Sequence, residues 1–140
     1  MRQKPADNPK CKALKAELAA QPDRQIVPIQ QFFDGNDDLA SIGCNLSRHP
    51  GIDRFRQILE GLAQRSDVAA VYARISEVDP GVGSWPFTDT VLVVGNISPE
   101  ELRDALSELE PDEIAPAQEF GVSPRVWEGH SLPVLAAWWD

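Results

Sequence analysis

A chain of 140 residues, 42% of them hydrophobic and 25% charged, is long enough to bury one apolar core and is expected to form a single domain. Its formal net charge of −9 repels phosphate backbones, which argues against nucleic-acid binding. No stretch approaches the ~20 apolar residues that span a bilayer, and the polar start lacks the apolar segment of a secretory signal. The sequence therefore predicts a soluble, cytoplasmic protein that binds neither nucleic acid nor membrane.

Charge is unevenly distributed along the chain. Residues 1–24 carry six Lys or Arg against three Asp or Glu, whereas the remaining residues carry seven against nineteen. We expect 1–24 to be a flexible leader with a short amphipathic helix over 10–21, in which Leu14 and Leu18 form a narrow apolar stripe. Residues 25–140 then form the folded body, and the sequence leaves open whether the leader helix docks on it.

The first part of the body is punctuated by turn-forming residues. Residues 26–33 are typical of a strand, and Pro28 predicts that this strand lies at an edge, because proline cannot donate to a ladder. An acidic turn follows at 34–38, and 41–46 is a second, shorter strand candidate. Apolar residues at helical spacing then predict a helix whose buried face comprises Ile52, Phe55, Leu59 and Leu62.

The most strongly patterned stretch is 68–95, which predicts two strands joined by a loop at 79–86. Its second arm contains four successive apolar, mostly β-branched residues at 91–94, the pattern of a central strand buried on both faces. Ser98 and Pro99 begin a further helix, since serine can cap it and proline suits the first helical position. An irregular connection at 111–131 and a final strand at 132–139 complete the chain.

From residue 41 onward this order is strand, helix, strand, strand, helix, strand. It predicts an α+β, ferredoxin-like (split βαβ) two-layer sandwich, an antiparallel sheet with two helices on one face. The N-terminal helix and an extra edge strand are added to it. The alternative is another α+β fold in which 26–33 is the first strand and 41–46 is its hairpin partner. In either fold the second face of the sheet needs a cover, which is the leader helix, the 111–131 connection or a second subunit.

Two acidic groups are candidates for a polar or metal site. The turn at 34–38 has the opening spacing of a calcium loop, but the glycine and the final glutamate of that motif are missing. The carboxylates of the hairpin mouth could be brought close together across the strands. The possible polar site therefore consists of Asp34, Asn36, Asp37, Asp38, Glu77 and Asp89. Simple turn formation and solubility are the alternative explanations, and the sequence does not identify a metal.

Other chemical motifs are weak. Cys11 and Cys44 form neither a disulfide framework nor a CxxC pair, and reduced thiols are expected. Cys44 with His49 or His130 is a possible nucleophile–base pair, although a cysteine in a strand is usually a small buried hydrophobe. No glycine-rich phosphate loop is present, and we expect no cofactor.

Aromatic residues outside the patterned helices and strands mark possible contact surfaces. Trp85 lies in the hairpin loop, either folded back over the core or offered to a partner. Trp138 and Trp139 are adjacent in the last strand, so their side chains point to opposite faces. Because aromatics are enriched at protein interfaces, these three tryptophans are the expected partner-binding residues.

Two hypotheses for function follow. The first is a small, acidic, non-enzymatic module that binds a protein partner or itself, as a homodimer; an acidic body suits a basic partner, as an inhibitor or immunity protein would require. The alternative is a small enzyme or metal-dependent protein that uses the acidic turn and the hairpin-mouth carboxylates. The alternative requires a concave pocket where several of its candidate groups meet, namely Asp37, Asp38, Cys44, Glu77, Asp89 and His130.

Overall fold

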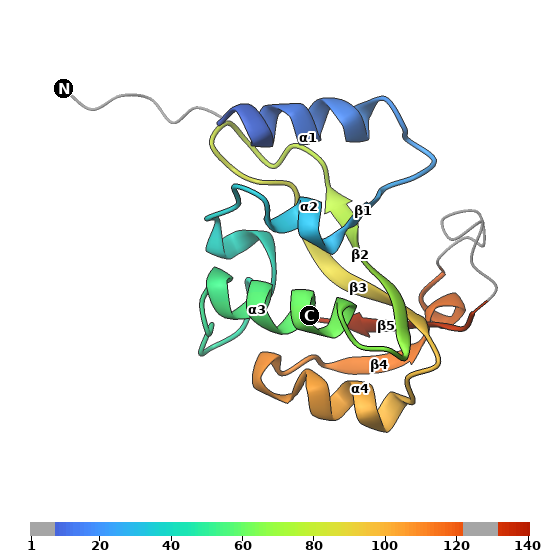
Figure 1. The fold of residues 1–140 in the computed structure, drawn as a ribbon. Coiled ribbons are helices and arrows are strands. Elements are labelled where there is room, and N and C mark those ends of the chain that lie inside the picture. The colour runs from blue at the N-terminus through green and yellow to red at the C-terminus, as the bar shows by residue number, and fades with distance from the viewer. Residues whose placement is uncertain (1–7, 122–131) are drawn as a thin grey trace.

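A computed structural model describes residues 8–121 and 132–140 of the chain (Figure 1). The helices are α1 (Pro9–Ala19), α2 (Ile29–Phe33), α3 (Ile52–Ala63) and α4 (Pro99–Ala105), with 3-10 turns η1 (Leu39–Ser41), η2 (Ser107–Leu109) and η3 (Ala117–Phe120). The strands are β1 (Ile26–Pro28), β2 (Val68–Glu77), β3 (Phe87–Gly95), β4 (Glu113–Pro116) and β5 (Val134–Trp138). The predicted α+β class is confirmed, and no helix in the described ranges is long and apolar enough to cross a membrane.

The strands form one antiparallel sheet in the order β1-β2-β3-β5-β4, with β3 at its centre. β3 is paired on both sides, so that Val93 lies opposite Val71 of β2 and Leu135 of β5. Residues 90–95 of this strand are all buried. The uninterrupted apolar run predicts a central strand buried on both faces, and the structure confirms that prediction.

Helices cover one face of the sheet, and the main core lies between them and the strands. α3 turns its predicted apolar face inward, with Phe55 and Leu59 fully buried. Burying one such side chain stabilises the fold by about 1.5–3 kcal/mol. α4 begins as its sequence predicts, because Ser98 accepts a hydrogen bond from the Glu101 amide and Pro99 occupies the first helical position.

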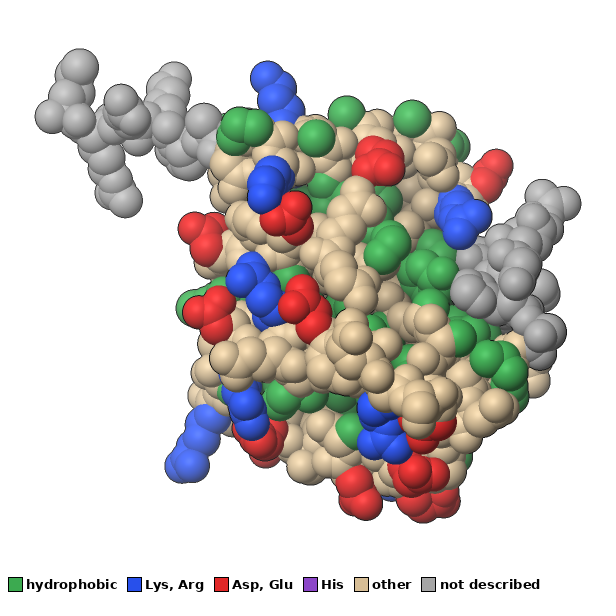
Figure 2. Space-filling view, viewed as in Figure 1, with side chains coloured by type: hydrophobic (Ala, Val, Ile, Leu, Met, Phe, Trp, Pro, Cys, Tyr) green, Lys and Arg blue, Asp and Glu red, His purple; other side chains and the backbone are tan. Residues whose placement is uncertain are grey.

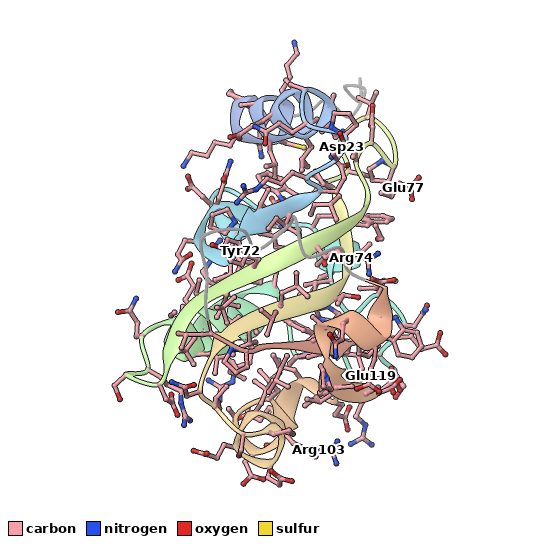
Figure 3. The ribbon with its side chains drawn as sticks, turned by 90° about the vertical axis from the view of Figure 1, so that its right-hand side faces the viewer. Asp23, Tyr72, Arg74, Glu77, Arg103 and Glu119 are labelled. Carbon is pink, nitrogen blue, oxygen red and sulfur yellow. The ribbon has the colours of Figure 1, made fainter. Side chains whose placement is uncertain are left out.

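A smaller apolar cluster lies on the opposite face of the sheet, and Figure 3 looks onto this face. Its buried members are Ile26, Leu92, Ala117 and Ala136. η3 brings Ala117 onto this face, and the Arg74 guanidinium donates to the carbonyl oxygen of Phe120 at 3.2 Å. Of the three covers that the sequence leaves open, the described part of the 111–131 connection is therefore one that the structure uses.

α1 docks on the body. Its buried residues are Cys11, Leu14, Lys15 and Leu18. Lys15 is only 8% exposed, and its ammonium group donates to the Gly81 carbonyl at 3.1 Å and pairs with Asp79 at 3.1 Å. The loop between β2 and β3 thus holds α1 through a charged anchor as well as apolar packing.

The strand expected at 26–33 is shorter than its pattern suggests. β1 ends at Pro28, which has φ −54° and ψ 142° and begins α2. Proline has no N–H group with which to continue a ladder, so the chain leaves the sheet there. The helical turn lets Phe32 and Phe33 both be fully buried, with ring centroids 5.2 Å apart, whereas a strand would point them to opposite faces. The predicted edge position of this strand is confirmed.

The strand expected at 41–46 is not formed. Only Ile42 pairs, through a single parallel bridge to Thr88, and the place beside β3 is taken by β5. Gly43 follows with φ +62°, and a Cβ there would lie 2.8 Å from the ring of Phe55. This left-handed glycine directs the chain away from the sheet. The ferredoxin-like arrangement depended on this segment as a strand and stays a prediction.

Both edge strands end in a proline. Pro28 closes β1 and begins α2, and Pro116 closes β4 with φ −53° and ψ 137° and begins η3. β4 itself lies inside the connection expected to be irregular. Of its four residues only Ile114 is buried. One apolar residue between polar or small ones is too short a pattern to distinguish a strand from a loop in the sequence.

Candidate functional site

The β2–β3 hairpin contains a β-bulge on β3. The paired residues on either side of it are Arg74 with Thr90 and Ile75 with Thr88. Asp89 therefore lies between two paired residues of β3 without an opposite residue on β2. Bulges redirect a side chain from the regular alternation of a strand and are enriched beside functional sites.

A second bulge follows at once on the neighbouring strand. Ile75 pairs with Thr88 and Glu77 pairs with Phe87, so Ser76 is the extra residue on β2. Because the two insertions lie on opposite strands, the register shift that one causes is reversed by the other. The register beyond them is the same as the register before them, and only the two extra residues leave the regular ladder.

A pocket of about 190 Å³ opens beside the two bulges, where β3 begins and β5 ends. Both extra residues, Ser76 and Asp89, line it. Trp138 of β5 and Cys44 of the η1–α3 connection line it as well. We refer to it as the bulge pocket. Its walls come from segments distant in sequence, which only the folded chain brings together.

The three tryptophans predicted to bind a partner differ in exposure. Trp85 is 3% exposed and folds back into the core, and Trp139 is 2% exposed. The Trp139 indole N–H donates to the Leu109 carbonyl at 2.7 Å, and its ring meets Phe55 edge to face at 5.9 Å. Trp138 is half-buried at the rim of the bulge pocket. Of the three, Trp138 is the aromatic that a partner can contact in this structure.

The acidic turn at 34–38 is occupied by its own structural contacts. The amide of Asn36 is buried, donates to the Ser41 hydroxyl at 3.0 Å and accepts the Asp38 N–H at 2.9 Å. The Asp38 carboxylate accepts two backbone N–H groups, those of Ala40 and Trp85. These bonds hold η1 and the hairpin loop together, which explains the polar residues without a ligand.

The remaining members of the possible polar site are dispersed over the surface. Asp34 pairs with Lys10 at 2.5 Å, and both side chains are exposed. Asp37 and Glu77 are exposed and do not line the bulge pocket, and Figure 3 shows Glu77 near the loop end of β2. Only Asp89 reaches the pocket. Within 8–121 and 132–140, no three His, Cys, Asp or Glu side chains converge as a metal site.

Cys44 is exposed in the bulge pocket, but the histidine nearest to it in sequence is already occupied. The Gly51 N–H donates to Nδ1 of His49 at 3.0 Å, so that nitrogen carries no proton. Nε2 therefore carries the proton and donates to the Ile42 carbonyl at 2.8 Å. Both ring nitrogens are used to hold the turn before α3, which leaves none to activate the thiol. His130, the other predicted base, lies outside the described residues.

The bulge pocket carries negative charge. Asp89 accepts a hydrogen bond from the Thr90 hydroxyl at 2.8 Å through Oδ1. Asp140 is held by its backbone, whose N–H donates to Asp112 and whose carbonyl accepts from Asn45. Neither side-chain carboxylate forms an ion pair within the described parts of the chain, and no Lys or Arg lines the pocket.

Four other hollows of the described surface lack this combination. Three of them are lined by an arginine as well as by carboxylates, namely Arg24, Arg56 or Arg103. A fourth, beside η3, contains no charged residue. Figure 2 shows a further gathering of Asp and Glu side chains over α4, but these lie on a convex helix surface. The bulge pocket alone among these five hollows joins carboxylates to an aromatic wall without a resident cation.

Electrostatic shifts lie elsewhere in the molecule. The Arg65 guanidinium, bonded to both oxygens of Asp67 at 2.9 Å, lowers the pKa of that carboxyl. Arg54 in the same way lowers the pKa of Glu108 through two hydrogen bonds that join α3 to η2. These pairs lie at the ends of helices, and neither lines the bulge pocket. Their role is structural.

Sequence reasoning identified Trp138 and Asp89 but assigned them to separate sites. It missed Ser76 and Asp140, and it weighed Cys44 only as a catalytic thiol. A bulge leaves little trace in the alternation of a strand. The one available sign is that Thr88, Asp89 and Thr90 are three polar residues in a row before an apolar run, which departs from the alternation of apolar and polar residues in a half-buried strand.

Comparison with known proteins places the chain in a family. The model described as "Uncharacterized protein YfbO family" matches residues 9–135. The Escherichia coli (strain K12) protein described as "Uncharacterized protein YfbO" is 27% identical over 131 residues, covering 84% of each chain. No solved structure matches the chain. With the family model covering all but a few residues at each end, the chain belongs to the YfbO family.

Proposed function

We propose that this protein is a small, non-enzymatic binding module whose bulge pocket docks a segment of a protein partner. The observation that carries the proposal is the rim of that pocket. There the half-buried Trp138 lines the same pocket as Asp89 and Asp140, whose side-chain carboxylates have no ion-pair partner among the described residues. Partly exposed aromatics with polar neighbours are typical anchors of protein interfaces.

The arrangement of the candidate catalytic groups supports binding rather than chemistry. The bulge pocket brings together Cys44 and Asp89, but Asp38 is bonded to backbone and Asp37 and Glu77 lie outside. Among the described residues no histidine is available as a base for the exposed thiol, because both nitrogens of His49 are engaged. A nucleophilic cysteine needs such a base or another activating charge.

Two finer aspects of function are proposed with this module. A basic partner, as in inhibitor or immunity proteins, suits the net charge of −9. Cys11 and Cys44 form no disulfide bond, which agrees with a reducing compartment such as the cytoplasm. Self-association through the same pocket is the alternative use of this surface, and light scattering distinguishes the two by mass.

Site-specific photo-crosslinking in cells tests the proposal. A photoreactive residue replaces Ser76 at the pocket, and the matched control replaces Ala16, a small exposed residue of α1. We expect a discrete adduct from position 76 that is absent from position 16 and that disappears when Trp138→Ala is added. Equal adducts from both positions, or an adduct indifferent to Trp138→Ala, would contradict docking at the bulge pocket.

A further inference from the structure

We infer that the bulge pocket accepts an arginine side chain presented by a basic segment of the partner, an inference that rests on the proposed function. The indole of Trp138 forms the wall against which the guanidinium stacks. The carboxylates of Asp89 and Asp140 receive its N–H groups. The argument rests on the charge balance of the pocket, on its size and on the shape of the cation that fits both.

Charge favours a cation from outside the chain. Oδ1 of Asp89 already accepts the Thr90 hydroxyl, but Oδ2 forms no hydrogen bond within the described residues. The Asp140 carboxylate is likewise uncompensated there, while its backbone is fixed by Asp112 and Asn45. Two carboxylates at an apolar wall, with no lysine or arginine among the described residues that line the pocket, favour the arrival of positive charge.

Size favours a side chain over a free small molecule. At about 190 Å³ the pocket is smaller than the roughly 300–1,000 Å³ of sites that enclose drug-sized ligands. It is also formed at the end of a sheet rather than inside the core. Such a hollow suits one anchoring side chain, while the segment that carries it lies across the surface.

Shape selects arginine among the cations. A guanidinium is planar, stacks on aromatic rings and donates in a fork that matches carboxylates, whereas an ammonium is a strongly hydrated point charge. A divalent metal requires more converging ligands, and the described residues hold no group of three His, Cys, Asp or Glu that could supply them. The aromatic wall has no function in metal binding but a direct one in stacking a guanidinium.

Three blocked peptides, each Gly-Ser-Xaa-Ser-Gly, test the inference on the full chain. Xaa is arginine, lysine or citrulline, and citrulline has nearly the shape of arginine without its charge. Binding is followed by the indole N–H signals of the four tryptophans in two-dimensional NMR, with Trp138→Phe assigning the signal of that residue. We expect the arginine peptide to shift the Trp138 signal, lysine to bind about two- to fivefold more weakly and citrulline at least about tenfold more weakly.

Matched protein variants separate the pocket from general attraction. Asp89→Asn keeps the oxygen that accepts the Thr90 hydroxyl, so the bulge should persist, and we expect arginine binding to weaken about five- to twentyfold. Asp104→Asn makes the same charge change on the exposed face of α4 and should alter binding less than about twofold. Equal citrulline binding, equal effects of the two variants, or an unperturbed Trp138 would each overturn the inference.

The two proposals fail in distinguishable ways. A crosslink from position 76 that requires Trp138, together with no preference for arginine over citrulline, would leave the binding module standing and remove its arginine ligand. Absence of both the crosslink and the peptide binding would remove both. An adduct with a second copy of the chain would show that the arginine, if required, comes from that copy.

Discussion

The middle and the loop end of the β2–β3 hairpin are formed by the same two strands but obey different constraints. In the middle, Val71 faces Val93 and Tyr72 faces Leu92 in an unbroken register. At the loop end, Ser76 and Asp89 are inserted on opposite strands, and both of these side chains are exposed. On β2 the buried residues alternate with half-buried ones, so a shift of one residue would turn the apolar side away from the main core, and the register is strictly held.

At the loop end, a pocket is formed without changing the register of the rest of the hairpin. A single bulge would have shifted every later pair by one residue. Two opposed bulges leave Glu77 opposite Phe87, in the register that the middle sets. The pairing of the core residues is therefore unchanged by the two extra residues, whose side chains line the bulge pocket.

The neighbouring tryptophans offer the largest contrast between the two environments. Trp139→Ala should lower the free energy of unfolding by about 3–5 kcal/mol, since it empties a buried site and orphans the Leu109 carbonyl. Trp138→Ala should cost about 1 kcal/mol because the half-buried ring leaves no enclosed cavity. Urea denaturation of both variants measures the difference. Equal losses would show that the bulge-pocket rim is part of the core.

The start of β2 and the end of β3 tolerate no added atom. A Cβ on Gly95 would lie 2.3 Å from the Asp67 carbonyl oxygen, where the Asn96 N–H also bonds. Gly95→Ala should therefore cost about 1–3 kcal/mol, as overpacking of a rigid backbone does. Gly61→Ala, a helix position with open space around it, is the control and should be neutral or stabilising by up to about 1 kcal/mol. A thermal midpoint for Gly95→Ala at or above that of the parent would contradict the model.

Deletions test whether the two bulges compensate. Removing Ser76 or Asp89 alone leaves one bulge unopposed and shifts the pairs beyond it by one residue. Removing both should restore regular pairing between Ala70 and Glu77 of β2 and their partners on β3. The double deletion should also be less destabilising than the sum of the single deletions by about 1–2 kcal/mol. The folded double deletion should also lose the crosslink made at the pocket, tested from Asn45. Additive single effects would mean that the bulges are independent.

Acid pH should reveal the contribution of the ion pair between Arg54 and Glu108 to stability. Arg54 lowers the pKa of Glu108, so this pair stabilises the fold above the unfolded value near 4.5 and loses that contribution as pH falls through the lower folded value. Glu108→Gln should make the thermal midpoint less sensitive to pH below about 4.5. The change should be small, since both side chains are exposed. An unchanged pH sensitivity in Glu108→Gln would contradict this contribution of the Arg54 pair.

Periodic segments of the chain could be predicted from the sequence. The two arms of the hairpin, the apolar face of α3 and the Ser98 cap of α4 were all confirmed, because burial and capping leave marks at fixed spacings. The prediction of a strand over all of 26–33 was wrong for 29–33, because Ile, Val and Phe are common in strands and suggested one there. The geometry of this segment is decided by one residue, Pro28, whose missing N–H outweighs the propensity of its neighbours.

The candidate site could be predicted only in fragments. Trp138 and Asp89 were identified as unusual residues. They line the same pocket only because β5 pairs with β3, a pairing between segments distant in sequence. The segment at 41–46 therefore does not pair as a strand in that position. No particular residue type marks the extra residue of a bulge. Ser76 and Asp140 are of types that are common on any protein surface. Sequence patterns indicate which residues are buried, whereas several residues of this site are exposed and follow no such pattern.

The two prolines at the edges of the sheet have a consequence for behaviour at high concentration. An unpaired edge strand is a template on which another chain can add strand after strand. Here β1 offers three residues and β4 four, and each stops at a proline whose ring replaces the donor that a neighbouring chain would need. We therefore expect refolding from denaturant to remain clear of fibrils even in concentrated solution. Pro28→Thr and Pro116→Thr together should make a fibril-binding dye respond.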